Sequence, residues 1–210
     1  MIEKIEKIKS CIKELFKDDF TGHDYLHSIR VYKNALNIAK YYDCNIELIS
    51  LASLLHDVDD HKLFNTIDYF NARTILTEMR YSNEVIEKVI NIIKTVSFKG
   101  KDSEKPTTIE GKIVQDADRL DALGAIGIAR TFAFGGSHNR PIYDPNIKPK
   151  LNMSFEEYKN IKNPTINHFY EKLFLLKDLM NTKEAYEIAL EREEFMKLFV
   201  KQFYSEVDDN

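Results

Sequence analysis

The sequence predicts an all-α protein, a compact bundle of several helices, and three observations support that fold class. Apolar residues recur at intervals of three and four along most of the chain, which is the pattern of amphipathic helices. Four of the five prolines are confined to residues 141–164, so most of the chain lacks strong helix breakers. The β-branched run at residues 85–93 would also suit a strand, but its interleaved Glu, Lys and Asn residues restore helical spacing.

The apolar periodicity divides the chain into successive helices. Asn45, Asn83 and Thr108 are expected N-caps, because their side chains can accept hydrogen bonds from the first turn of a helix. The helix that begins at Thr108 is apolar nearly all round as far as Phe134, so a buried and central position is expected for it. The predicted helices cover residues 1–17, 23–42, 46–57, 69–79, 84–94, 108–134, 167–179 and 183–206.

Residues 135–164 interrupt the helical pattern with a Gly-Gly pair and most of the prolines. The segment is too long for a simple connection, so a functional role or disorder is expected. Ser154 and Glu157 near its end have the spacing of a capping box. The segment is interpreted as a long loop insertion that either covers an active site or lies solvated on the surface.

Length and composition indicate one helical domain over residues 1–210, with a core at about 20–135, the loop at 135–164 and C-terminal helices at 165–206. The chain is 43% hydrophobic and 11% aromatic, which suffices for a sizeable core. Its formal net charge of −4 gives no indication of general nucleic-acid binding or of a membrane surface. The sequence leaves open whether the chain forms a homodimer.

The two cysteines, Cys11 and Cys44, lie far apart and form no C-x-x-C motif, so we expect buried thiols rather than a disulfide or a zinc site. The sequence contains neither a run of about 18 apolar residues nor a signal-peptide pattern. A cytoplasmic, reducing location is therefore expected.

The stretch 51–61 carries the strongest chemical signal in the chain. It begins as an apolar, helix-favouring run and ends in three carboxylates and two imidazoles within six residues, 56–61. Such groups repel one another unless a positive charge lies among them, and both types are ordinary ligands of divalent metals. Taken alone, the stretch is equally compatible with a helix that ends in solvated polar residues.

Two further stretches place ligand-type residues in helical and partly apolar surroundings. One contains His23 and His27, which share a helix face because they are four residues apart. The other is the run 115–124, with Asp116, Asp118 and Asp121 in an otherwise apolar helix. Burying a bare carboxylate costs several kcal/mol, so a metal ion or an arginine is expected beside these acids.

This ordered set resembles the HD-domain superfamily of metal-dependent phosphohydrolases, through His27, the His56-Asp57 doublet and Asp118. The resemblance covers roughly residues 20–145. The run that follows Asp116, with glycines at 124 and 127, is similar to a bacterial subgroup that includes nucleoside triphosphate pyrophosphohydrolases. The same subgroup resemblance, through Gly-Gly at 135–136 and the residues around Arg140, favours the active-site cover for the loop insertion.

The resemblance implies one divalent metal ion held by His27, His56, Asp57 and Asp118. Two imidazoles and two carboxylates without a thiolate suit Mn²⁺, Fe²⁺, Co²⁺, Ni²⁺ or Mg²⁺ better than structural zinc, and Mn²⁺ is the preferred candidate. Four protein ligands on an octahedral ion leave two positions for water and a phosphate oxygen.

Catalytic roles follow from residues near the doublet. Asp60 is the expected general base or water-orienting group, and Asp59 is the second choice. His61 and Lys62 match the subgroup's usual His-Lys pair, which implies phosphate contacts or support of the metal site. Further candidate substrate contacts are cationic or imidazole side chains, each with a structural role as the alternative: Arg30, Lys94, Arg119, His138 and Arg140.

The predicted function is metal-dependent hydrolysis of a nucleotide or another phosphorylated small molecule. Within the subgroup that the chain resembles, the best match is conversion of a (deoxy)nucleoside triphosphate to the monophosphate and pyrophosphate. Two alternatives stay open, a nucleotide phosphomonoesterase or phosphodiesterase and a non-catalytic, metal-binding helical sensor module. The intact ligand set argues against the sensor, because a degenerate copy would have lost at least one ligand.

Overall fold

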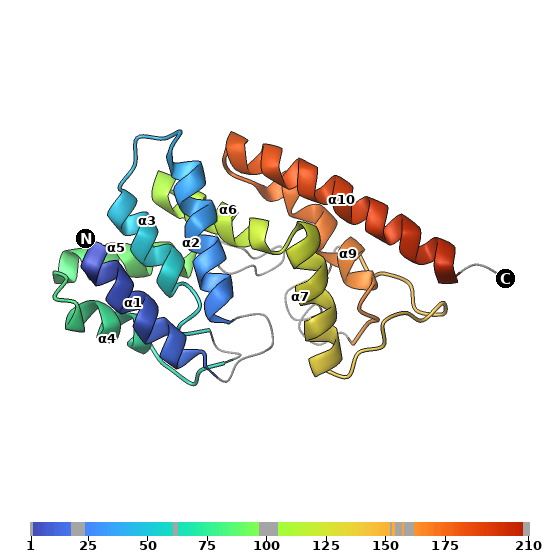
Figure 1. Ribbon diagram of the computed structural model, residues 1–210, viewed down its shortest axis with the longest axis horizontal. Coiled ribbons are helices and arrows are strands. Elements are labelled where there is room, and N and C mark those ends of the chain that lie inside the picture. The colour runs from blue at the N-terminus through green and yellow to red at the C-terminus, as the bar shows by residue number, and fades with distance from the viewer. Residues whose placement is uncertain are drawn as a thin grey trace. The chain divides into compact units, whose positions relative to one another are not determined.

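Helices make up the regular structure of the computed structural model, and no strand occurs in the residues that it describes, which are 2–17, 24–60, 63–96, 105–151, 153, 157 and 162–207 (Figure 1). The all-α prediction is therefore confirmed. None of the helices in these ranges is both long enough and apolar enough to cross a membrane. The elements are α1 (Ile2–Leu15), α2 (Tyr25–Ala39), α3 (Ile46–Leu55), α4 (Phe70–Glu78), α5 (Asn83–Lys94), α6 (Ile109–Asp121), α7 (Gly124–Ser137), α9 (Asn167–Glu171), η2 (Leu173–Leu175), η3 (Lys177–Leu179) and α10 (Lys183–Val207).

The chain divides into two compact units, and the boundary falls inside α6, after Asp118. The first unit consists of Met1–Phe98 and Ser103–Asp118, and the second of Lys99–Asp102 and Arg119–Asn210. The single domain expected over residues 1–210 stays a prediction.

Helix α3 is the centre of the first unit. Every residue from Ile49 to Leu55 is buried, and the helix packs against α1, α2 and α5. A helix that is apolar on all sides is stable in water only when neighbours surround it. The buried run continues through His56, Asp57 and Val58, so the packing of α3 carries both residues of the His-Asp doublet into the interior of the unit.

The second unit has a core of aromatic rings between its helices. Phe169 of α9 is fully buried, and its ring lies 6.1 Å from that of Phe132 on α7 and 5.8 Å from that of Phe199 on α10. Helix α10 packs along α7 and against η3. Rings at these separations attract one another beyond simple area burial, which stabilises the seam of the three helices.

The prediction of one continuous helix from Thr108 to Phe134 was wrong, because α6 ends at Asp121 and α7 begins at Gly124. Leu123 between them is extended, and Gly124 has a left-handed φ of +72°. A side chain at Gly124 would therefore be strained. A Cβ at Gly127 would lie 2.2 Å from the Ala122 carbonyl oxygen, so this glycine permits the tight turn.

The expected N-caps at Asn45 and Thr108 are confirmed. Asn45 Oδ1 accepts a hydrogen bond from the backbone N–H of Leu48 (3.1 Å), and Thr108 Oγ1 accepts one from Gly111 (3.1 Å). The cap expected at Asn83 was wrong by one position, because Ser82 Oγ accepts the bond from Val85. The Ser154 of the expected capping box lies outside the described residues.

Helix α7 runs to Ser137 and so includes the first residues of the predicted 135–164 loop. Backbone hydrogen bonds join the later part of the segment to the start of α9, from Thr165 N–H to Pro141 O (2.8 Å) and from Ile166 N–H to Ile142 O (3.1 Å). The Glu171 carboxylate also accepts a bond from the Lys150 N–H (3.0 Å). The described part of the insertion is thus fastened within the second unit.

The single helix expected over residues 167–179 is instead α9 followed by the two short 3₁₀ helices η2 and η3. The break falls at Lys172, whose backbone angles (φ −140°, ψ −55°) are not helical. In a 3₁₀ turn, side chains three residues apart lie on the same side. Leu173 and Leu176 are both buried as a result.

Candidate metal centre

His27 lies in the first turn of α2 and is fully buried. Asp24 caps this helix, and its Oδ1 accepts a hydrogen bond from the backbone N–H of His27 (2.7 Å). A carboxylate cap satisfies one of the free donors at a helix N-terminus and is favoured by the helix dipole. The cap therefore fixes the backbone that carries the His27 imidazole.

His56 is the C-cap of α3, 6% exposed, and its ring orientation is set by the helix itself. Its Nδ1 lies 2.9 Å from the carbonyl oxygen of Ser53, which can only accept, so Nδ1 carries the donated proton. In the neutral imidazole this leaves the lone pair on Nε2. Histidine ligands of metals in proteins are commonly oriented by such a bond on the other ring nitrogen.

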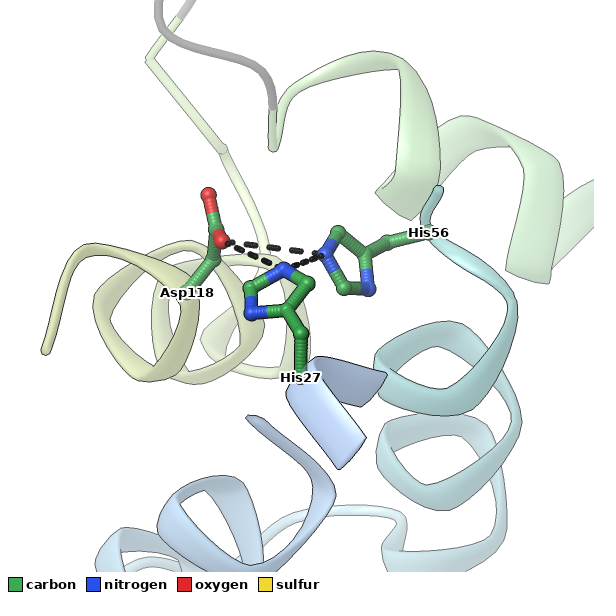
Figure 2. Close-up of side chains that lie close together, drawn as sticks. All are labelled: His27, His56 and Asp118. Atoms are coloured by element: carbon green, nitrogen blue, oxygen red, sulfur yellow. Dashed lines mark hydrogen bonds and ion pairs between the residues drawn. The ribbon is translucent and has the colours of Figure 1, made fainter. Parts of the chain in front are cut away.

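The two imidazoles and the carboxylate of Asp118 point toward one another from three helical segments (Figure 2). The Nε2 atoms of His27 and His56 are 3.1 Å apart. Asp118 Oδ1 lies 3.4 Å from His27 Nε2 and 3.6 Å from His56 Nε2. Residues 29 and 62 positions apart along the chain thus meet at one point.

Asp57 completes the set from the position next to His56. Its two carboxylate oxygens lie 3.2 Å from His27 Nε2 and 3.4 Å from His56 Nε2. Ligand atoms that bind one ion at about 2.1 Å and at right angles are about 3 Å apart. The ligand atoms of His27, His56 and Asp118 all lie within 4.8 Å of one another, and Asp57 lies beside both imidazoles, so its part as a fourth ligand stays a prediction.

The electrostatics of the cluster favour a bound positive charge. Burial by itself lowers the pKa of His56, but the carboxylates of Asp57 and Asp118 outweigh it and hold the pKa well above its usual value. Burial by itself raises the pKa of Asp118, but His56 and His27 outweigh it and the net pKa is lowered. Two facing ring nitrogens at 3.1 Å attract each other only with a proton or a cation between them. The donor set, with nitrogen and oxygen and no thiolate, fits a divalent metal ion.

The structure distinguishes the two acids that follow the doublet. Both carboxylate oxygens of Asp59 accept backbone hydrogen bonds at the start of α4, from Asn71 and Ala72 (2.9 Å each). Asp60 is half-buried, and its backbone N–H donates to Asp57 O (3.0 Å). Asp59 therefore caps the start of α4. Asp60 is the better candidate for the general base. His61 and Lys62 lie outside the described residues.

Arg30 is half-buried on α2, one turn after His27. Lys94 is exposed at the end of α5, with its ammonium 5.9 Å from the centre of the Tyr69 ring. Their predicted roles as substrate contacts stay predictions.

The other three predicted substrate contacts belong to the second unit. Arg119 donates to the carbonyl oxygen of Leu179, which is a structural contact. The ring of His138 stacks on Phe134 at 3.9 Å, and the Arg140 guanidinium lies 5.4 Å from the centre of the same ring. Contact with substrate stays a prediction for all three.

Two supporting residues were missed by the sequence reasoning, Asp24 and Asn71. Asp24 precedes His27 by three residues, and the cap-to-third-residue spacing of a helix N-terminus is a signal that could have identified it. Asn71 donates from its side chain to the Val58 carbonyl (2.7 Å), a link across 13 residues that no local pattern announces.

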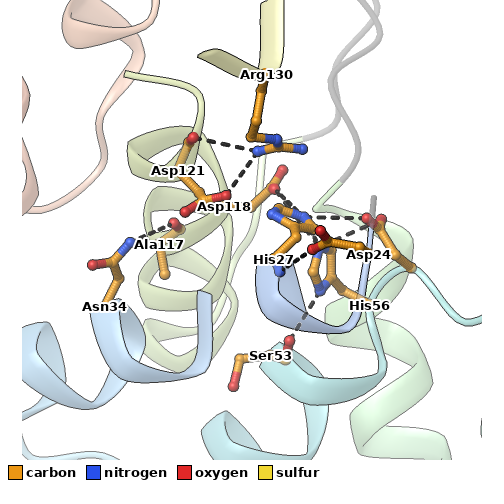
Figure 3. Close-up of polar contacts among 10 residues, drawn as sticks. Asp24, His27, Asn34, Ser53, His56, Ala117, Asp118, Asp121 and Arg130 are labelled. Carbon is orange, nitrogen blue, oxygen red and sulfur yellow. Dashed lines mark hydrogen bonds and ion pairs between the residues drawn. The ribbon is translucent and has the colours of Figure 1, made fainter. Parts of the chain in front are cut away.

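The polar contacts around the cluster continue along α6 (Figure 3). Asn34 of α2 donates to the Ala117 carbonyl at 3.4 Å, next to Asp118. Asp121, near the end of the helix, is 2% exposed and forms an ion pair with Arg130 (2.8 Å). The sequence predicted a metal ion or an arginine beside the acids of this helix, and for Asp121 the arginine is Arg130.

Comparison with known proteins agrees with this geometry. Residues 24–123 match the model of the HD domain family. The uncharacterized protein YpgQ of Bacillus subtilis is 35% identical over 98% of this chain and 95% of its own. A crystal structure of an HD-superfamily hydrolase from Bacillus thuringiensis is 41% identical, covers 99% of this chain and 98% of its own, and superposes with a TM-score of 0.76.

A crystal structure of B. subtilis YpgQ in complex with ADP is also similar, with 32% identity, coverage of 98% of both chains and a TM-score of 0.78. The matched family region contains all four predicted ligands, His27, His56, Asp57 and Asp118. Sequence, geometry and relatives lead to the same assignment. The chain belongs to the HD-domain superfamily of metal-dependent phosphohydrolases.

Proposed function

We propose that the protein hydrolyses a (deoxy)nucleoside triphosphate to the monophosphate and pyrophosphate, with one divalent ion held by His27, His56, Asp57 and Asp118. The observation that carries the proposal is the cluster of His27, His56 and Asp118 within the first unit, with Asp57 3.2 and 3.4 Å from the two imidazoles. A buried set of this composition is unfavourable without a cation and matches the ligand preferences of Mn²⁺.

When bound, the ion would lower the pKa of water and neutralise charge that develops on the phosphoryl group. Asp60 would accept the proton of the attacking water, whose oxygen forms a bond to the α-phosphorus. The bond between the α-phosphorus and the bridging oxygen would break, and pyrophosphate would leave with the electron pair. Asp60 is preferred over Asp59 as the base because both oxygens of Asp59 are engaged by the backbone of α4.

The nucleotide class of the substrate is supported by the relative whose structure contains ADP. Cations at Lys62, Arg30 and Lys94 are the proposed phosphate contacts in the first unit, because multiply charged phosphates need several donors. Arg119, His138 and Arg140 stay candidate substrate contacts on the basis of the sequence alone.

The test is metal analysis followed by product analysis. The purified protein, loaded with Mn²⁺, is incubated with a panel of nucleoside mono-, di- and triphosphates and cyclic nucleotides, and phosphate and pyrophosphate are measured separately. Pyrophosphate release from triphosphates is the expected result. Release of inorganic phosphate alone, or opening of cyclic nucleotides, would instead support the phosphomonoesterase or phosphodiesterase. A bound metal with no turnover of any substrate would support the sensor module.

The choice of metal is tested in the same assay. Mn²⁺ is expected to support the highest turnover, ahead of Mg²⁺, Co²⁺, Ni²⁺ and Fe²⁺, because its preference for carboxylate and water ligands fits a site with two carboxylates and open positions. A protein that retains zinc through chelation and is inactive with Mn²⁺ would contradict this choice.

A further inference from the structure

Helix α4 begins without a side-chain cap of its own. Its N-cap residue, Tyr69, makes no capping hydrogen bond. The missing acceptor comes from Asp59, whose Oδ1 and Oδ2 accept the backbone N–H groups of Asn71 and Ala72 at 2.9 Å each. These are the second and third residues of the helix, the donors that an N-cap side chain normally satisfies.

Asn71 returns a hydrogen bond in the opposite direction. Its side-chain Nδ2 donates to the backbone carbonyl of Val58 at 2.7 Å. Val58 is fully buried, and it lies between Asp57 and Asp59. Three hydrogen bonds therefore join the turn of residues 56–60 to the first turn of α4, and we call the pair Asp59 and Asn71 the clamp.

The backbone before α4 is unusual. Asp68 and Tyr69 are consecutive non-glycine residues with left-handed φ values of 54° and 58°. Such a conformation persists only where the surroundings impose it. Arg73 contributes by donating from Nε to the Asp68 carbonyl at 2.8 Å. Hydrogen bonds with Asp59 and Arg73 thus fix the start of α4, and the turn is attached to this fixed backbone.

We propose that Asp59 and Asn71 are positioning residues that hold the 56–60 turn and thereby the side chain of Asp60 for the reaction. The inference rests on the proposed function, since it assigns the two residues a part in that reaction. Asp60 follows the clamped residues directly, its backbone N–H donates to Asp57 O within the turn, and its carbonyl oxygen accepts from the N–H groups of Leu63 and Phe64 beyond it. A carboxylate that must take a proton from water depends on placement, because small displacements of a catalytic group cost large factors in rate.

The chemistry of the clamp also explains why Asp59 itself is unsuited to be the base. Its two oxygens are held in one orientation by the backbone N–H groups of Asn71 and Ala72, so both are committed to the start of α4.

The experiment compares Asp59→Ala and Asn71→Ala with Ser82→Ala. Ser82 caps α5 through its hydroxyl oxygen, which accepts a hydrogen bond from the Val85 N–H, and is the matched control for loss of a helix cap. For each variant, metal content, kcat and KM are measured with Mn²⁺ and a nucleoside triphosphate. Both clamp variants are expected to keep the metal and KM and to lose kcat by about 10- to 100-fold. Ser82→Ala is expected to keep kcat.

The conservative variant Asp59→Asn retains one carbonyl acceptor and is expected to recover part of the lost rate. A fall in thermal stability with unchanged kcat in the clamp variants would overturn the proposal in favour of a purely structural cap. A parallel loss of metal would also overturn it, because the clamp would then serve the ligands rather than Asp60.

Amide hydrogen exchange provides a readout that does not require turnover. The exchange of the Asp60, Leu63 and Phe64 amides is expected to accelerate in Asp59→Ala and Asn71→Ala and to stay unchanged in Ser82→Ala. If the unaltered protein hydrolyses nothing, the proposed function fails, and the exchange rates still decide whether the clamp holds the turn. Unchanged exchange in the clamp variants overturns the inference whatever the activity.

Discussion

Asp118 and Asp121 lie three residues apart on one helix, and each has a different partner. Asp118 contacts the imidazoles of His27 and His56 at 3.4 and 3.6 Å. Asp121 forms an ion pair with Arg130 at 2.8 Å and is almost fully buried. Two aspartates of one helix thus have different roles. Asp118 faces imidazoles that can bind a metal ion, and Asp121 pairs with a permanently charged arginine.

The difference shows what distinguishes a structural acid from a candidate ligand. Arginine is always protonated and satisfies a carboxylate without any further group. A neutral imidazole instead offers a lone pair to a cation, and a carboxylate beside two imidazoles adds a further ligand atom. The comparison predicts that loss of Asp118 is a loss of metal and loss of the Asp121 pair is a loss of stability.

The largest effect is expected from Asp118→Ala. Removal of this oxygen donor should abolish both metal retention and turnover, as should His56→Ala, because the remaining ligands bind the ion too weakly. Metal analysis after dialysis and a pyrophosphate assay measure the two losses. Mn²⁺ should raise the melting temperature of the unaltered protein but not of the variant, since only a ligand that binds the folded state stabilises it.

The control for this variant is Glu84→Ala, which removes an exposed carboxylate paired with Lys88. It should keep the metal and the activity. Retention of a full complement of metal by Asp118→Ala would mean that Asp118 is not a ligand, and the contrast with Asp121 would disappear.

A smaller effect is expected from Asp60→Asn. The variant should keep the metal and lose about 10²- to 10⁴-fold in kcat, the usual contribution of a general base. The comparison of kcat with metal content per chain separates this result from that of Asp118→Ala. Normal turnover by Asp60→Asn would remove Asp60 from the role of base.

The Arg130→Met variant tests the structural half of the comparison. It removes the Arg130 guanidinium from the buried Asp121 carboxylate, which should destabilise the protein by about 3 kcal/mol. Urea unfolding measures the change. The double variant with Asp121→Asn should recover part of the loss, because the buried negative charge is gone. Loss of metal at unchanged stability would contradict the structural assignment.

The smallest effect on stability is expected at His168 in the second unit. The pKa of His168 is lowered, whereas that of His56 is raised. Burial, aided by Lys172 and Arg140, lowers the pKa of His168 to about 3. The unfolded chain binds a proton near pH 6.5, whereas the folded chain does not. The contribution to stability is therefore complete above about pH 6.5 and is lost progressively as the pH falls toward 3.

The variant His168→Gln should accordingly move the midpoint of acid unfolding to lower pH, with little change at pH 8. Circular dichroism during an acid titration measures the shift. An unchanged midpoint would mean that His168 titrates normally in the folded protein.

Much of the fold follows from local pattern. The helix periods, the caps at Asn45 and Thr108 and the burial of α3 were all predicted, because each depends on residues close together in the chain. The break between α6 and α7 was missed. Apolar periodicity continues across Leu123 and Gly124, so the pattern contains no sign that the helix breaks there.

The sequence by itself determined which residues have the chemistry of metal ligands and in what order they come, since side-chain type and helical spacing are local properties. Only the tertiary structure decided which acids face the imidazoles and which meet a cation or a helix end. Asp59 and Asp60, like Asp118 and Asp121, look alike in a sequence. Their different roles arise from the direction in which each backbone carries its carboxylate and from partners that lie far away along the chain.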